Sequence, residues 1–179
     1  MKHPSKIKAV ILLSGSAKMV VAAAYAPYYE TPEKRIAAID TYLAPKWFKA
    51  VTRETWDDND FLPGDHVVNP VLGLRLWREA ASPKLHVWIR YLCEFNAQDI
   101  VAQLSTLTVP TLLLKPGLEG FAESVDQNYM VNYCHTSWDG VENHTSITVK
   151  TIPESRVFLW LDQPQRVGDE IGLFLGRVR

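Results

Sequence analysis

Short runs of apolar residues mark the predicted strands of this chain. Residues 109–114, with the sequence VPTLLL, form a continuous apolar run that is too short for a buried helix. Pro110 lies near its start, and Pro116 and Gly117 follow its end. A continuous run closed by turn residues is typical of a parallel strand with both faces buried. The pattern predicts an α/β protein, with functional groups just past this strand, in the loop at residues 115–120.

Two further segments complete the predicted sheet. Residues 6–14, KIKAVILLS, alternate at first and then become wholly apolar, as in a strand that enters the middle of a sheet. Residues 147–152, ITVKTI, alternate cleanly and predict a third strand. A last helix is expected to start at residues 162–164. The residues expected on its inner face are Val167, Ile171, Leu173 and Phe174.

The segment between the first two strands has a helical pattern. Helix starts are expected at Thr31-Pro32, at Asn69-Pro70 and at Ser82-Pro83, because each pair places a capping residue before a proline. Four of the six tryptophans lie in this segment: Trp47, Trp56, Trp77 and Trp88. Apolar residues at helical spacing are usually core, so we expect these rings mainly to pack the helices against one another and the sheet.

Composition excludes several classes of function. The 19 basic residues are scattered among 20 acidic ones, so no basic patch for nucleic acid is expected. Lys6 and Lys8 interrupt the apolar start, which argues against a signal peptide and for a cytoplasmic protein without membrane association. The two cysteines, Cys93 and Cys134, are expected to be free buried thiols rather than a disulfide framework.

Three motifs resemble the second half of the α/β-hydrolase fold. The run L-x-x-L-x-V-P-T-L-L-L at residues 104–114, followed by Gly117 and Glu119, is similar to the penultimate strand of that family. Residues 3–10 resemble its strand after the nucleophile helix, and Asp162-Gln163-Pro164 resembles the end of its catalytic-histidine loop. The resemblance implies a partial α/β-hydrolase-like parallel sheet of about three strands, formed by residues 1–16 and 101–179, with a helical cap at residues 17–100.

The family's acyl-transfer chemistry uses a serine, a histidine and an acid. The sequence contains no G-x-S-x-G, and the nearest approach, Ser14-Gly15-Ser16, lacks the first glycine. Alignment on the D-Q-P motif places Val157 at the histidine position, which leaves His135 or His144 as replacements to be weighed. Glu119 is the one triad residue that the resemblance predicts, with Asp126 as a weaker second candidate.

A metal site is also weighed and set aside. Five residues of types that bind metals fall within eleven positions, but their spacing matches no tetrahedral zinc pattern. These residues are Cys134, His135, Asp139, Glu142 and His144. Because the sequence contains neither a phosphate-binding loop nor a dinucleotide motif, no metal and no cofactor are expected.

Two functions remain. The first is an ester-type, small-molecule hydrolase half or fragment, expected to be inactive as an isolated chain, whose cap aromatics line a pocket for a small apolar substrate. The second is a non-catalytic binding or interaction module that has lost the triad. In either case the strand at residues 7–14 would expose one edge, which self-association or a partner chain is expected to cover.

Overall fold

A parallel three-stranded sheet forms the centre of the molecule. The computed structural model describes residues 6–18, 33–34, 37, 66–80, 84, 86–87, 91, 98–120, 130–131, 133–141 and 143–178. Within these residues the strand order is β1 (Val10–Leu13), β2 (Thr111–Pro116) and β3 (Ile147–Ile152). Both pairings are parallel, with Val10 opposite Thr111 and Thr111 opposite Ile147. The expected α/β class and parallel sheet are confirmed.

The strand boundaries differ from the expected ones. β1 begins only at Val10 and ends before Ser14, whose φ of 59° is incompatible with a strand. β2 continues through Lys115 and Pro116, which we expected in a loop. Along β2 the N–H groups alternate in direction, and that of Thr111 points to the β3 side. The nitrogen of Pro116 therefore faces the β1 side, beyond the end of β1, so its missing N–H removes no ladder bond.

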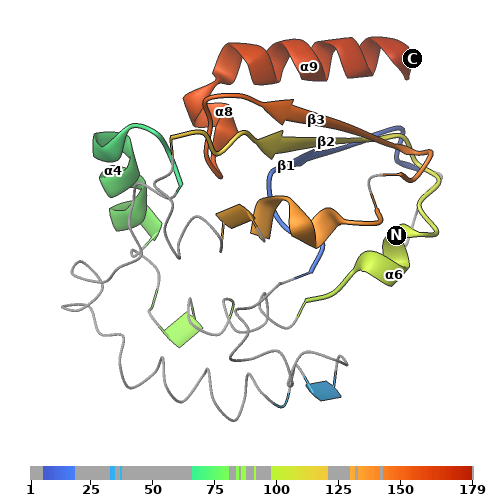
Figure 1. Ribbon diagram of the computed structural model, residues 1–179, viewed down its shortest axis with the longest axis horizontal. Coiled ribbons are helices and arrows are strands. Elements are labelled where there is room, and N and C mark those ends of the chain that lie inside the picture. The colour runs from blue at the N-terminus through green and yellow to red at the C-terminus, as the bar shows by residue number, and fades with distance from the viewer. Residues whose placement is uncertain are drawn as a thin grey trace.

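Helices cover both faces of the sheet, giving three layers (Figure 1). α9 (Pro164–Arg177) packs on one face, where Val167 and Phe174 contact Leu112 and Leu114. The other face is covered by α6 (Val101–Leu104) and the short helix η5 (Thr136–Trp138), with Leu113 and Trp138 at the centre of the contact. Alternate β2 side chains thus enter opposite cores, and each buried leucine contributes roughly 1.5–3 kcal/mol of burial free energy.

The two well-described helices begin as the sequence predicts. In α4 (Pro70–Ala80), Asn69 Oδ1 accepts the N–H groups of Val71 at 3.0 Å and Leu72 at 3.3 Å, which caps the helix. α9 has proline in its first turn. Its inner face holds Val167 and Phe174, with Ile171 half-buried against them. The prediction for Leu173 is wrong: that side chain is 59% exposed, because it lies outside the i, i+4, i+7 stripe.

Hydrogen bonds and one ring contact join the segment before α4 to the core. In α8 (Leu159–Asp162), the Asp162 carboxylate accepts the N–H of Val68 through Oδ1 and that of Arg156 through Oδ2, both at 2.9 Å. The N–H of Phe158 donates to the carbonyl of His66 at 2.8 Å, and their rings pack 5.2 Å apart. α4 therefore lies at the end of the sheet where the strands finish (Figure 1).

The segment between residues 18 and 99 leaves and rejoins the core at one place. The N–H of Ile100 donates to the carbonyl of Ala17 at 2.9 Å, and Lys18 and Asp99 form an antiparallel bridge. Most of the helices expected after Thr31 and Ser82, with Trp47, Trp56 and the side chains of Trp77 and Trp88, lie outside the described residues. Among the described helices, none has the length and apolar character needed to cross a membrane.

Candidate active site at the carboxyl edge of the sheet

The loops that follow β2 and β3 are bonded together. The N–H of Gly117 donates to the carbonyl of Ile152 at 2.8 Å, and that of Leu118 donates to the carbonyl of Ser155 at 2.9 Å. Leu118 and Glu154 have φ values of 62° and 54°, a region that L residues rarely occupy. Backbone strain of this kind persists only where surrounding bonds hold it, and it is concentrated at functional sites.

Glu119 lies where the resemblance predicts, in the loop past the carboxyl end of β2. Its side chain is exposed, and Oε2 accepts the N–H of Glu154 at 2.8 Å. The carboxylate folds back over Gly117, where the Cβ of any other residue would overlap it. Glu119 therefore links the β2 and β3 loops. The second acid candidate, Asp126, lies outside the described residues.

Val157 lies in an apolar environment at the position expected for the family's histidine. Its side chain is 7% exposed and packs in a buried cluster with Leu118, Met130 and Cys134. No group in that cluster exchanges a proton at neutral pH, so a base at the carboxyl edge would have to be another residue.

His135 occupies that edge. It precedes η5, is half-buried, and its Nε2 lies 2.8 Å from the carbonyl oxygen of Pro116, the last residue of β2. Burial lowers the pKa of His135 and the Lys115 ammonium adds to this, while the Pro116 carbonyl, Asp139 and Glu119 oppose it. The net direction is downward, so the ring is neutral at neutral pH.

Lys115 is the least expected residue of the site. It is 4% exposed within the central strand, and its Nζ donates to the backbone carbonyl of His135 at 3.4 Å. Burial lowers the pKa of Lys115, and the negative charges of Asp139 and the Cys134 thiolate form oppose that effect. The side chain spans from β2 to the segment that carries His135.

Ser14 and Cys134 join this segment to the end of β1. Ser14 Oγ lies 3.7 Å from Cys134 Sγ, and both side chains are buried. Burial raises the pKa of the Cys134 thiol to about 12, so it stays protonated, as expected of a free buried thiol. Trp138 Nε1 donates to the carbonyl of Gly15 at 3.1 Å, a second link between the same two segments.

The Ser14-Gly15-Ser16 turn is not a nucleophile elbow. An elbow places its serine between a strand and a helix. Here the positive φ of Ser14 resembles one, but the following residues are irregular and lead to the Lys18–Asp99 bridge, so no helix begins there. The structure thus agrees with the sequence, which contains no G-x-S-x-G.

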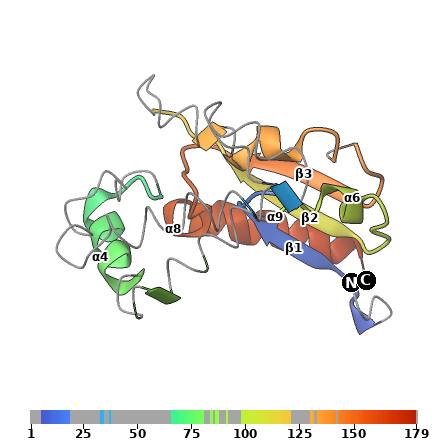
Figure 2. The same cartoon turned by 90° about the horizontal axis from the view of Figure 1, so that it is seen from below.

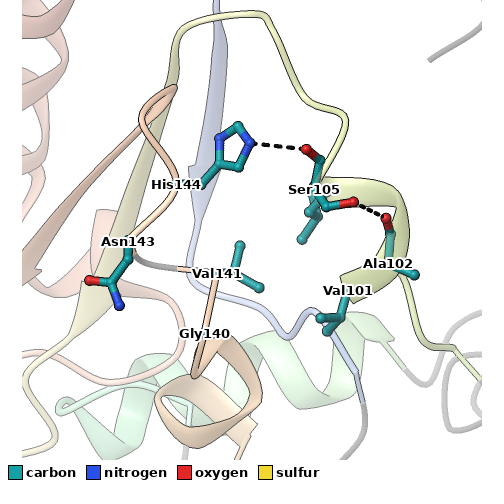
Figure 3. Close-up of a pocket in the computed structure, with 8 residues that line it drawn as sticks. Val101, Ala102, Ser105, Gly140, Val141, Asn143 and His144 are labelled. Atoms are coloured by element: carbon teal, nitrogen blue, oxygen red, sulfur yellow. Dashed lines mark hydrogen bonds between the residues drawn. The ribbon is translucent and has the colours of Figure 1, made fainter.

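His144 lies at the amino end of the sheet, three positions before β3 begins at Ile147. Figure 3 shows its ring directed toward Ser105. Its Nε2 donates to the carbonyl of Ser105 at 3.1 Å, and its Nδ1 accepts the N–H of Ser146 at 3.3 Å. Both ring nitrogens are therefore used in joining the end of the α6 segment to β3. The metal-type residues at 134–144 are split between the two ends, and among the described residues no three such side chains converge.

Sequence reasoning missed three residues of the site: Ser14 as a strained position, Cys134 as its contact, and Lys115 as a buried cation. No sequence signal identifies Lys115 as buried, because the run Lys115-Pro116-Gly117 predicts a loop after the strand. The contact between Ser14 and Cys134 joins residues 120 positions apart in the sequence, so no local sequence pattern predicts it.

Comparison with known proteins yields a match in structure only. No protein-family model and no curated protein sequence matches this chain. A solved structure of a thermophilic esterase matches with a TM-score of 0.54 at 12% identity, covering 99% of this chain and 59% of its own. A malate-bound thermophilic esterase from Thermogutta terrifontis matches with a TM-score of 0.51 at 17% identity, covering 99% and 58%. The chain shares its fold with these esterases.

The parallel sheet and the fold shared with these two esterases agree with the expected α/β fold class. An α/β-hydrolase enzyme from a Medee basin deep-sea metagenome library is also similar, with a TM-score of 0.49 at 14% identity over 98% of this chain and 58% of its own. In all three cases the chain spans less than three fifths of the length of the matched protein. At these identities the likeness establishes the fold alone.

Proposed function

We propose that this chain contributes the acid-bearing and cap-bearing part of an ester hydrolase that acts on small apolar substrates. The observation that carries the proposal is the set of ionisable groups at the carboxyl edge of a parallel sheet whose fold two esterases share. Ligands and reacting groups gather at that edge in open α/β sheets. Glu119 takes the role of the acid, and the serine comes from a polypeptide segment outside residues 1–179.

The proposal divides the chain into a core, residues 1–16 and 101–179, and a cap, residues 17–100. Its support is the point where the two parts meet. The Ile100–Ala17 hydrogen bond and the Lys18–Asp99 bridge hold both ends of the inserted segment together, as an insertion into a continuous core requires. The bonds from Asp162 to Val68 and Arg156 hold the base of α4 over the carboxyl edge, where a cap would cover a substrate.

The outer edge of β1 is the place where the serine-bearing segment would join. The N–H groups of Val10 and Ser14 bond to β2, so those of Ile11 and Leu13 point to the other side, and in the described part of the chain no strand pairs there (Figure 2). An apolar cavity of about 290 Å³ runs beside this edge, between β1, the α6 segment and Trp138. An added strand would satisfy the edge, and side chains next to it would fill the cavity.

The alternative is a binding or interaction module without catalysis. Two observations favour it: Val157 at the expected histidine position, and the hydrogen bond that commits Glu119 to the backbone of Glu154. On this account the cavity beside β1 and the cap would hold a ligand or a partner that is released unchanged.

The experiment begins with the nucleotide sequence before the Met1 codon and with neighbouring reading frames. The chain is expressed with the segment that encodes G-x-S-x-G, and hydrolysis of p-nitrophenyl acetate is measured with and without a fluorophosphonate. Hydrolysis that depends on both parts and is blocked by the fluorophosphonate is the expected result. Absence of such a segment, together with an inert chain, would establish the binding module instead.

A further inference from the structure

The proposed hydrolase lacks a base at the position where its fold would place one, and the described residues include four histidines that could take that role. Of these, His86 is exposed in the segment between β1 and β2. His144 is excluded by its contacts, because a carbonyl and an N–H group engage its two ring nitrogens at the amino end of the sheet. His66 packs its ring on Phe158 beneath α4. His135 is the histidine whose ring touches the carboxyl end of the central strand, through Pro116.

The Pro116 contact fixes the tautomer of His135. A carbonyl oxygen only accepts hydrogen bonds, so the nitrogen 2.8 Å from it, Nε2, carries the proton. In the neutral ring Nδ1 then holds the lone pair. A buried carboxylate does this work in a catalytic triad, where it selects the tautomer and orients the ring. Here a backbone carbonyl of β2 performs the same selection.

The position of His135 is held from both sides. Lys115 donates to its backbone carbonyl, and the preceding residue, Cys134, contacts Ser14 at the end of β1. A reacting group gains most from binding when its geometry is set before the substrate arrives. The ring is thus placed by β1 and β2 together, at the end of the sheet where the cap begins.

The surrounding charges suit a ring that receives a proton and returns it. Asp139 and Glu119 favour the imidazolium form, while Lys115 and burial disfavour it. The net shift disfavours the protonated ring, so it does not persist at rest, and Asp139 and Glu119 offset part of the cost of forming it during the reaction. Glu119 acts on His135 through space in this arrangement, because its own hydrogen bond goes to Glu154.

We infer that His135 is the general base of the hydrolase, with Nδ1 as its reacting atom. The inference rests on the proposed function and names a residue that the fold does not place there. The serine hydroxyl gives its proton to Nδ1 as the serine oxygen bonds to the ester carbonyl carbon. Nδ1–H then protonates the leaving alcohol as its C–O bond breaks. A water molecule repeats the sequence, which releases the carboxylic acid and restores the serine O–H and neutral His135.

The test compares H135Q with H144Q and H66Q in the form that carries the serine. Glutamine is chosen because its side-chain amide still donates to the Pro116 carbonyl, and circular dichroism checks that each variant folds. We expect kcat for p-nitrophenyl acetate to fall about 10²- to 10⁴-fold in H135Q and by less than about threefold in H144Q. In the unmodified protein kcat/KM should rise with pH to a plateau with a midpoint below 6.5.

Failure of the inference and failure of the proposed function give different results. If the unmodified protein hydrolyses the ester and H135Q retains its rate, or if H66Q alone loses it, the assignment of His135 is overturned while the hydrolase stands. An inactive unmodified protein overturns both. An independent reading comes from ¹⁵N NMR of the histidine rings in the chain alone: a proton on Nδ1 of His135 instead of Nε2 at neutral pH would also overturn the assignment.

Discussion

His135 and His144 lie nine positions apart in the sequence and at opposite ends of the same sheet. At the amino end, His144 is fully hydrogen-bonded and lines a shallow cavity of about 380 Å³ whose other walls are mostly small or apolar, between α6 and the segment before β3 (Figure 3). At the carboxyl end, His135 adjoins a buried lysine, a buried thiol and strained loops. At the amino end, both ring nitrogens of His144 have hydrogen-bond partners. At the carboxyl end, burial disfavours the charged forms of Lys115 and His135.

The two ends of the sheet differ in how their ionisable groups affect the stability of the fold. A buried amine and a half-buried neutral imidazole cost folding free energy compared with apolar residues. Such groups are retained where their protonation is used, and perturbed ionisable groups are accordingly concentrated at active sites. On the proposed function, the carboxyl end would hold the reacting groups, and the amino end would contribute to the stability of the fold.

The largest expected effect comes from filling the space over Gly117. In G117A the new Cβ overlaps the Glu119 carboxylate, so the Glu119–Glu154 hydrogen bond must break or the loop must move. Because Glu119 is exposed and its carboxylate can move aside, we expect the loss of one hydrogen bond, about 0.5–1.5 kcal/mol in the free energy of unfolding, measured by urea denaturation. The control is G172A on the exposed side of α9, where nothing lies within 4 Å and the added methyl should stabilise by about 0.5–1 kcal/mol. Equal effects would contradict the difference between the two sites.

A second substitution removes the buried cation. K115M keeps the length of the side chain and eliminates the desolvated ammonium, so we expect it to stabilise the fold by about 1 kcal/mol. The matched control is K150M on β3, where the side chain is exposed and the change should stay within about 0.5 kcal/mol. Thermal unfolding of both variants provides the measurement. A destabilised K115M would mean that the bonds of Lys115 outweigh its burial.

The smallest expected effect is a pH dependence. Because the pKa of His135 lies below the usual histidine value of 6.5, the unfolded chain takes up the proton first as pH falls. The unmodified protein should therefore lose stability relative to H135Q as pH falls from about 7 through 6.5, and the two should run parallel above about pH 7.5. H144Q provides the reference for a histidine outside the site. A difference that grows as pH rises would contradict the lowered pKa.

The sequence alone predicts most of the core. The apolar runs at residues 109–114 and 147–152 and the Asn69-Pro70 cap are local patterns, and each corresponds to an element of the structure. The end of β2 was not predictable in this way. Lys115 and Pro116 stand directly before Gly117 and together predict a turn. Their place in the strand depends on β1 being short, and the sequence of β2 contains no information about the length of β1.

The site is less visible in the sequence than the fold. Glu119 was placed by its position after a strand, which is a local argument. The choice between His135 and His144 depends on which end of the sheet each ring reaches, and that follows from the path of the chain between β2 and β3. The positive φ of Ser14 and its contact with Cys134 also arise from tertiary structure, since serine carries no signal for that conformation.

The most direct test of the account is to locate the reactive serine. The chain is treated with a fluorophosphonate, alone and together with the segment that carries G-x-S-x-G, and the adduct is mapped by mass spectrometry. The account predicts an adduct on the G-x-S-x-G serine, accompanied by loss of p-nitrophenyl acetate hydrolysis, and none within residues 1–179. An adduct on Ser14 or Ser16 of the chain alone, with loss of an ester-hydrolysing activity, would contradict it.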